Sequence, residues 1–152
     1  MRFVVIIFIA LLSGCTGLPE SIGELQTNSH KTFSFNADIS PEKTYELLQK
    51  EMVACYAYNG ELTYPVAGSF ITSSAQAGMF VEGSKLSSDE YQIALSQQVE
   101  PYPRGYLELV RITGEVGQTT VYVYPLNRFW ERHVKRIETW LEGGHVDDCR
   151  IW

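Results

Sequence analysis

The stretch YLELVRITGEVGQTTVYVY, residues 106–124, decides the fold of this chain. Both of its ends are rich in β-branched and aromatic residues, which favour strands. Its centre, residues 114–117, reads GEVG, and a short connection with glycines suits two antiparallel strands. The stretch therefore predicts a hairpin between a strand at residues 106–113 and a strand at residues 119–124.

Three shorter segments with strand character come before this hairpin. Residues 68–75 and 78–83 are expected to form two short strands, joined by a turn at residues 76–78. In residues 91–95 large apolar side chains alternate with smaller or polar ones, a period typical of a strand with one buried face. The chain from residue 62 to residue 125 is therefore predicted to be β throughout.

Two amphipathic helices are predicted, one before and one after these strands. The first begins at Ser40-Pro41-Glu42, because serine caps helices, proline fits the first helical position and glutamate favours the N-terminal end of the helix dipole. It is expected to extend to residue 58. The second covers residues 128–142, with apolar residues at helical spacing. These are Trp130, Val134, Ile137 and Leu141.

A strand at residues 33–39, in which apolar and polar side chains alternate, precedes the first helix. The predicted order is therefore β-α-β-β-β-β-β-α. Because the strands follow one another between two helices, we expect an α+β fold: an antiparallel sheet of about five to six strands, with both helices packed on one face. Residues 32–152 are sufficient for a single domain of this kind.

The N-terminus has the layout of an export signal. Arg2 precedes an apolar run of ten residues at positions 3–12. As a helix this run measures about 15 Å, whereas the hydrocarbon core of a bilayer is about 30 Å thick. The run is therefore too short to span a membrane, and residues 1–14 are predicted to be a cleaved signal peptide.

The run ends in Leu12-Ser13-Gly14-Cys15, which resembles the lipobox of bacterial lipoproteins. The resemblance implies cleavage before Cys15 and attachment of lipid, palmitate included, to that residue. Thr16 stands where an aspartate would favour retention at the inner membrane, so the resemblance implies an outer-membrane anchor facing the periplasm. The rest of the chain resembles small uncharacterised envelope lipoproteins in its spread of aromatic residues and its late Cys149, and this second likeness implies no activity.

Residues 15–31 are predicted to be a lipidated, flexible tether. They are mostly polar, contain Gly17, Pro19 and Gly23, and show no sustained hydrophobic period. An extended chain of about fifteen residues reaches up to ~50 Å, which is enough to hold a domain clear of the lipid headgroups.

The chain has three cysteines, Cys15, Cys55 and Cys149. If lipid occupies Cys15, the other two are the single possible pair in an oxidising compartment. We therefore predict a disulfide between Cys55 and Cys149, with two buried free thiols as the alternative.

Composition and motifs argue against nucleic-acid binding and most catalysis. The formal net charge is −6, and an acidic chain repels phosphate backbones. The sequence contains no Gly-x-Ser-x-Gly elbow and no phosphate loop, so we predict no catalytic residue and no cofactor. His145-Val146-Asp147-Asp148 is the most metal-like cluster, but it is interpreted as a polar tail beside the disulfide, with no metal site. Glu131 and His133 are interpreted as part of a solvated helix face.

Three tyrosines form the candidate interaction surface. Tyr102 stands between two prolines in a loop that we expect to be exposed. Tyr122 and Tyr124 would make the sheet face away from the helices aromatic if they point outward. Tyrosine has an apolar body and a polar tip, which suits interfaces.

The sequence therefore favours a non-enzymatic interaction or scaffolding module of the cell envelope, which docks other envelope proteins or cell-wall polymer. The alternative is a binder of a small apolar ligand, with a pocket between the helices and the sheet. An enzyme is a third and more distant hypothesis.

Overall fold

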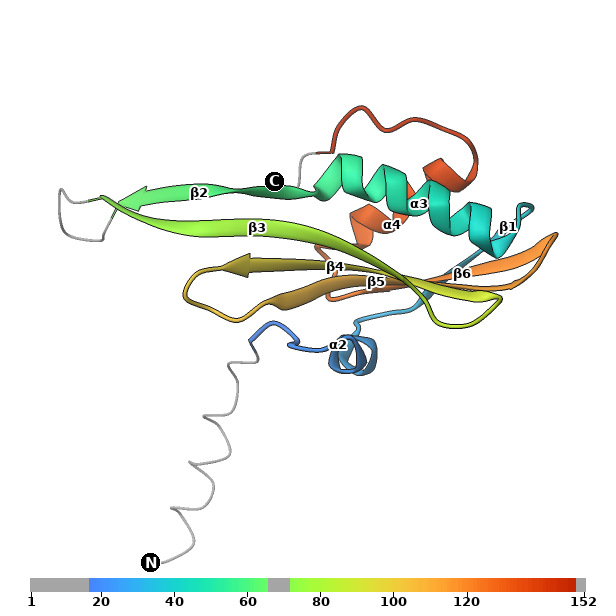
Figure 1. Ribbon diagram of the computed structural model, residues 1–152, viewed down its shortest axis with the longest axis horizontal. Helices are drawn as coiled ribbons and strands as arrows, with labels where there is room; N and C mark the ends of the chain where they lie inside the picture. The colour runs from blue at the N-terminus through green and yellow to red at the C-terminus, as the bar shows by residue number, and fades with distance from the viewer. Residues whose placement is uncertain (1–16, 66–71, 150–152) are drawn as a thin grey trace, which may run out of the picture.

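A six-stranded antiparallel sheet lies at the centre of the molecule, with helices on both of its faces (Figure 1). The structure is a computed structural model that describes residues 17–65 and 72–149. The predicted signal segment at residues 1–14 and the predicted lipid-attachment residue Cys15 lie outside the described residues.

Within the described residues, the elements follow the predicted order β-α-β-β-β-β-β-α, preceded by a helix that was not predicted. In the sheet the strands stand in the order β1-β6-β5-β4-β3-β2, and every neighbouring pair is antiparallel. The strands are β1 (Phe33–Ala37), β2 (Tyr58–Pro65), β3 (Thr72–Lys85), β4 (Glu90–Val99), β5 (Gly105–Glu115) and β6 (Gln118–Pro125). The helices are α2 (Ile22–Asn28), α3 (Pro41–Tyr56) and α4 (Glu131–Leu141). The predicted α+β class and antiparallel sheet are confirmed.

The first two strands after α3 differ from the prediction. β3 is one continuous strand, which runs through the turn predicted at residues 76–78. β2 occupies residues 58–65, where the sequence predicts the end of the first helix and the beginning of the β region but no separate strand. The reason is pairing: β3 is bonded to β2 as far as Met79 and to β4 from Ala77 onward, so Gly78 is held extended between two partners. Part of the strand predicted at residues 68–75 lies outside the described residues.

Helices α3 and α4 cover one face of the sheet (Figure 1). The Ser40 hydroxyl accepts a hydrogen bond from the Lys43 amide at 3.4 Å, and Pro41 is in the first turn, so α3 begins as its sequence predicts. Helix α4 begins at Glu131, later than the predicted residue 128. The main core fills the space between these helices and the sheet. It includes Leu48, Met52, Tyr56, Ile93, Leu95, Val110, Ile112, Val121, Val123, Val134, Ile137 and Trp140.

Helix α2 covers part of the opposite face, in the segment for which the sequence predicts a flexible tether (Figure 1). The Ser21 hydroxyl caps this helix by accepting a hydrogen bond from the Glu24 amide at 3.1 Å. Leu25 is fully buried against Ala94 and Leu109. One buried leucine gives no sustained period in the sequence, but it is sufficient to dock a two-turn helix on an apolar part of the sheet. The described residues from Leu18 to Asn28 are therefore packed on the domain.

Cys55 and Cys149, the pair expected from the cysteine count, form a disulfide with their Cα atoms 5.1 Å apart. Cys55 lies in the last turn of α3, and Cys149 follows α4 and its terminal turn. The bridge closes a loop with a sequence separation of 94 and ties the segment after α4 to the end of α3.

Candidate functional site

The three predicted interaction tyrosines lie on two different parts of the molecule. Tyr102 is in the loop between β4 and β5, and 71% of its surface is exposed. Tyr122 and Tyr124 lie on β6 and alternate with buried valines, so they face away from α3 and α4, as the hypothesis requires. Tyr124, however, packs against the cluster around Leu25 beneath α2. The structure therefore does not join the three tyrosines into one aromatic surface.

The loop that carries Tyr102 is held in place by backbone hydrogen bonds. The Tyr102 amide donates to the Val99 carbonyl at 2.9 Å, and the Glu100 amide donates to the Gln76 carbonyl at 2.9 Å. At the end of the loop the Arg104 guanidinium lies 4.2 Å from the centre of the Phe80 ring and pairs with Glu82 at 2.6 Å. The ring of Tyr102 is thus presented to solvent from a fixed backbone.

The beginning of the described chain lies beside this loop. A surface hollow of about 400 Å³ has Gly17 and Leu18 on one side and Tyr102 and Pro103 on the other. A second hollow, of about 680 Å³, continues from Leu18 along α2 to Asn127. Both hollows are open grooves along the docked segment, and sequence reasoning missed them because it predicts no docked structure there.

Leu18 is fixed where β5 begins. A Cβ atom added to Gly105 would stand 2.2 Å from the Cβ atom of Leu18, so glycine at this position lets the Leu18 side chain lie directly on the backbone of β5. The next carbonyl along the chain, that of Pro19, accepts a hydrogen bond from the Tyr106 amide at 2.8 Å. At the other end of the segment the Ser29 hydroxyl donates to the Pro125 carbonyl at 2.8 Å. Residues 18–29 are therefore held to the sheet at both ends.

A second candidate site is a group of ionisable side chains sealed beneath α4. Glu108 and His133 are both fully buried, and the side chain of neither has a hydrogen-bond partner in the described part of the chain. The ring of His133 stacks on Tyr56 at 4.8 Å between centroids, and the edge of Trp130 approaches it at 4.4 Å. The Arg136 guanidinium donates to the Tyr56 hydroxyl at 3.4 Å.

Burial sets the protonation state of both groups. It raises the pKa of Glu108 to about 8, although the charge of Arg136 opposes the shift. It lowers the pKa of His133 to about 3, and the positive charges of Arg136 and Arg132 act in the same direction. Burial and the neighbouring Glu108 also raise the pKa of Tyr56. Near neutral pH the carboxyl is mostly protonated and the imidazole is neutral.

The prediction that His133 lies on a solvated helix face is wrong. Helix α4 is oriented so that His133 points inward together with Trp130, Val134 and Ile137, which stand at i−3, i+1 and i+4 from it. Glu108 lies two residues before Val110 on β5, so it faces the core that α3 and α4 cover. The pairing of β4 with β5 shifts by one residue beside it, which brings Leu107 into the same core. The sequence contained the helical spacing around His133 and the period of two that links Glu108 to Val110, whereas the shift in strand register beside Leu107 could not be predicted from it.

A carboxyl group and an imidazole with shifted pKa values are the groups that acid–base catalysis uses. A substrate would need access to them, but both side chains have no exposed surface. The hollows beside Leu18, Phe35, Phe80 and Tyr102 include neither side chain. In this structure the group therefore acts as part of the core.

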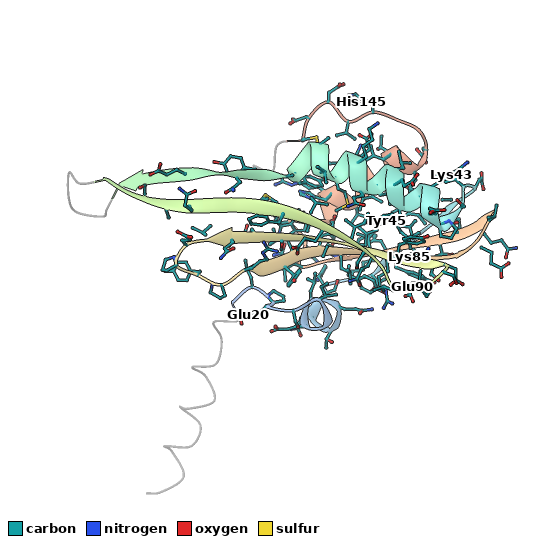
Figure 2. All side chains as sticks on the ribbon, viewed as in Figure 1. Glu20, Lys43, Tyr45, Lys85, Glu90 and His145 are labelled. Carbon is teal, nitrogen blue, oxygen red and sulfur yellow. A yellow bond between two sulfur atoms is a disulfide. The ribbon has the colours of Figure 1, made fainter. Side chains whose placement is uncertain are left out.

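The cluster His145-Val146-Asp147-Asp148, which the sequence suggests as the nearest approach to a metal site, is solvent-exposed at His145 and Asp147. His145 lies in the loop after α4, and Figure 2 shows its side chain on the outside of the helical layer. Its Nε2 atom is 3.4 Å from Asp147, and the two side chains are 78% and 96% exposed. Within residues 17–65 and 72–149, no three His, Cys, Asp or Glu side chains are grouped as a metal site requires.

The alternative hypothesis places a ligand pocket between the helices and the sheet. That space contains the packed side chains of the main core. The hollow nearest to that description is an open groove of about 480 Å³ between β1 and α4. Its apolar lining is Phe33, Phe35 and Val134, and the rest is charged. The charged residues are Glu131, Arg132, Lys135 and Glu138.

A comparison of the chain with protein-family models and with curated proteins finds no match. Among the helices that the structure describes, none has both the length and the apolar character needed to cross a bilayer. The function must therefore be argued from the residues themselves.

Proposed function

We propose that this protein is an extracytoplasmic lipoprotein, anchored through lipid on Cys15 and acting as a non-enzymatic interaction or scaffolding module of the cell envelope. The observation that carries the proposal is the sequence Leu12-Ser13-Gly14-Cys15 directly after a short apolar run. An outer-membrane anchor facing the periplasm follows from Thr16.

The disulfide between Cys55 and Cys149 supports an oxidising compartment, because such bridges are rare in reducing cytosol. The burial of Glu108 and His133 supports a function without catalysis, since the two side chains with the most enzyme-like pKa values are closed off from solvent.

An interaction role is supported by exposed apolar side chains at both ends of the sheet. Tyr102 lies at one end. At the other end, where the hairpin turns after β3 and β5 lie (Figure 1), Leu86 and Val116 are 45% and 81% exposed. These side chains are accessible for contact with another protein or with an envelope polymer.

A small apolar ligand is the second candidate function. The groove between β1 and α4 favours it, because two phenylalanines line the groove. Its open shape and four charged lining residues fit an apolar ligand less well than an enclosed pocket would.

The deciding experiment is intact mass spectrometry of the protein extracted from membranes, before and after reduction and alkylation. We expect a mass for cleavage before Cys15 plus two or three acyl chains, and two alkyl groups gained after reduction alone. A Cys15→Ser variant should lose the acyl mass and leave the membrane fraction. An unmodified N-terminus in the parent would refute the anchor. Cross-linking in intact cells should then capture a reproducible envelope partner, and repeated failure to do so would argue against the interaction role.

A further inference from the structure

The docked N-terminal segment limits how far an anchor at Cys15 can lie from the domain. Leu18 already packs at the start of β5 and is three residues beyond Cys15 in the sequence. Three extended residues span at most about 11 Å. A free tether of about fifteen residues would instead allow up to ~50 Å.

This docking depends on several independent contacts. Leu18 approaches Gly105 without room for a side chain there, and the carbonyl of Pro19 accepts a hydrogen bond from Tyr106. Leu25 is fully buried on the sheet. At the end of the segment His30 lies 3.1 Å from Glu131 of α4. A free tether of about fifteen residues would require all of these contacts to break.

Tyr102 is the exposed aromatic side chain next to this anchor point. It shares the hollow of about 400 Å³ with Gly17, which is two residues after Cys15. Its loop is fixed by hydrogen bonds to β3 and β4, and its ring is 71% exposed. Tyrosine favours the boundary between lipid and water, because its ring is apolar and its hydroxyl remains hydrated.

From this arrangement we infer that the end of the sheet with Tyr102 faces the bilayer, and that the Tyr102 ring lies among the headgroups of a zwitterionic lipid surface. The inference rests on the proposed attachment of lipid at Cys15. Acyl chains in the bilayer core keep Cys15 at its surface, and the headgroup region on each side is about 5–8 Å deep. Leu18, at most about 11 Å from Cys15, therefore lies inside that layer or within about 3–6 Å of it.

Charge selects the kind of lipid. Three exposed glutamates lie near this end of the sheet: Glu20 lines the hollow, Glu24 lines the second hollow along α2, and Glu100 is two residues before Tyr102. Figure 2 shows Glu20 on the side of the sheet that carries α2. The nearby Arg104 is paired with Glu82. An acidic surface is repelled by anionic headgroups at low salt, whereas zwitterionic headgroups do not repel it.

Two matched nitroxide labels test the inference. Tyr102→Cys and Val116→Cys place single new thiols at opposite ends of the sheet, while Cys55 and Cys149 stay oxidised. The acylated full chain is reconstituted in phosphatidylcholine vesicles, and collision of each label with oxygen and with a water-soluble nickel complex is measured. We expect at least a two-fold higher ratio of oxygen to nickel collisions at position 102. Vesicles with phosphatidylglycerol should reduce this difference at low salt.

Equal ratios at the two positions would overturn the inference, and the acyl mass of the same sample would show that the anchor itself is sound. Loss of the acyl mass would remove both the anchor and the inference. A third variant, Gly105→Ala in the Tyr102→Cys background, separates docking from anchoring. It should displace Leu18 and lower the ratio at position 102 while the acyl mass stays. An unchanged ratio in this variant would contradict the role of the docked segment.

Discussion

The rings of Tyr56 and His133 lie face to face, with their centroids 4.8 Å apart and their planes inclined by 8°. Tyr56 ends α3 and His133 belongs to the first turn of α4, so the pair joins the two helices that cover the sheet. Glu108 lies in the same buried region; burial raises the pKa of Tyr56, and the charge of Glu108 acts in the same direction. The contact between the two helices therefore includes ionisable side chains whose pKa values are shifted.

Glu108 should make the protein less stable as pH rises. Its pKa is 4.5 in an unfolded chain and about 8 in the folded protein, so between these values the folded state holds a proton that the unfolded state releases. The free energy of unfolding should fall across this window by up to ~1.4 kcal/mol per pH unit. Glu108→Gln keeps the shape and removes the ionisation, so its urea midpoint should change much less between pH 5 and 8. If the urea midpoints of the parent and of Glu108→Gln change with pH in parallel, Glu108 is not the group responsible.

His133 should act in the opposite direction. Its pKa is 6.5 when unfolded and about 3 when folded, so the unfolded state binds a proton that the folded state excludes. Stability should fall as pH decreases from 6.5 toward 3, again by up to ~1.4 kcal/mol per pH unit. His133→Phe retains a ring to stack on Tyr56. In urea titrations, its stability should therefore decrease much less between pH 6.5 and 3 than that of the parent. The exposed His145→Gln variant is the control, and an equal effect of both substitutions would exclude a special role for His133.

The effects of Glu108 and His133 on the free energy of unfolding have opposite dependence on pH, which gives a third prediction, for the unmodified protein. Between pH 4.5 and 6.5 they cancel, so stability should be greatest there and should decline on either side. Thermal unfolding measured at half-unit steps of pH would test this. A single maximum above pH 8 would show that other groups dominate.

Much of the fold was predictable because local signals agreed with the packing. The hairpin of β5 and β6 combines β-branched strands with a glycine-bearing turn, and Ser40-Pro41 marks the start of α3. The strand count was also correct, but for a wrong reason. Two short strands predicted within residues 68–83 correspond to the single strand β3, and β2 was not predicted. Pairing with distant partners holds Gly78 in a strand, and no local pattern encodes that.

The candidate sites were less predictable for related reasons. Helix α2 is stable because Leu25 enters an apolar part of the sheet that exists only after β4 and β5 pair. Glu108 shares a face of β5 with Val110 and Ile112, and it is buried because the helices cover that face in the tertiary fold. Tyr102 was correctly expected to be exposed, since prolines on both sides stiffen the loop, but its proximity to Leu18 depends on the tertiary fold.

Leu25→Ala should detach α2 from the sheet. Removing a fully buried leucine costs about 2–5 kcal/mol, which is more than a helix of seven residues with one buried side chain can offset. We expect the amide hydrogens of α2 to exchange much faster, while those of β4 and β5 stay protected. Thr27→Ala, on the exposed side of the same helix, is the matched control. Unchanged exchange in α2 after Leu25→Ala would mean that other contacts hold the segment.

Reduction of the Cys55–Cys149 disulfide should destabilise the domain without changing its fold. The bridge closes a loop with a sequence separation of 94, and the chain-entropy model gives roughly 4–5 kcal/mol of stabilisation for a loop of that size. Urea unfolding with and without dithiothreitol should therefore show a large loss of stability in the parent. A Cys55→Ser/Cys149→Ser variant should match the reduced parent and be insensitive to the reductant. If the reductant lowers the stability of the double variant equally, the effect does not come from this bridge.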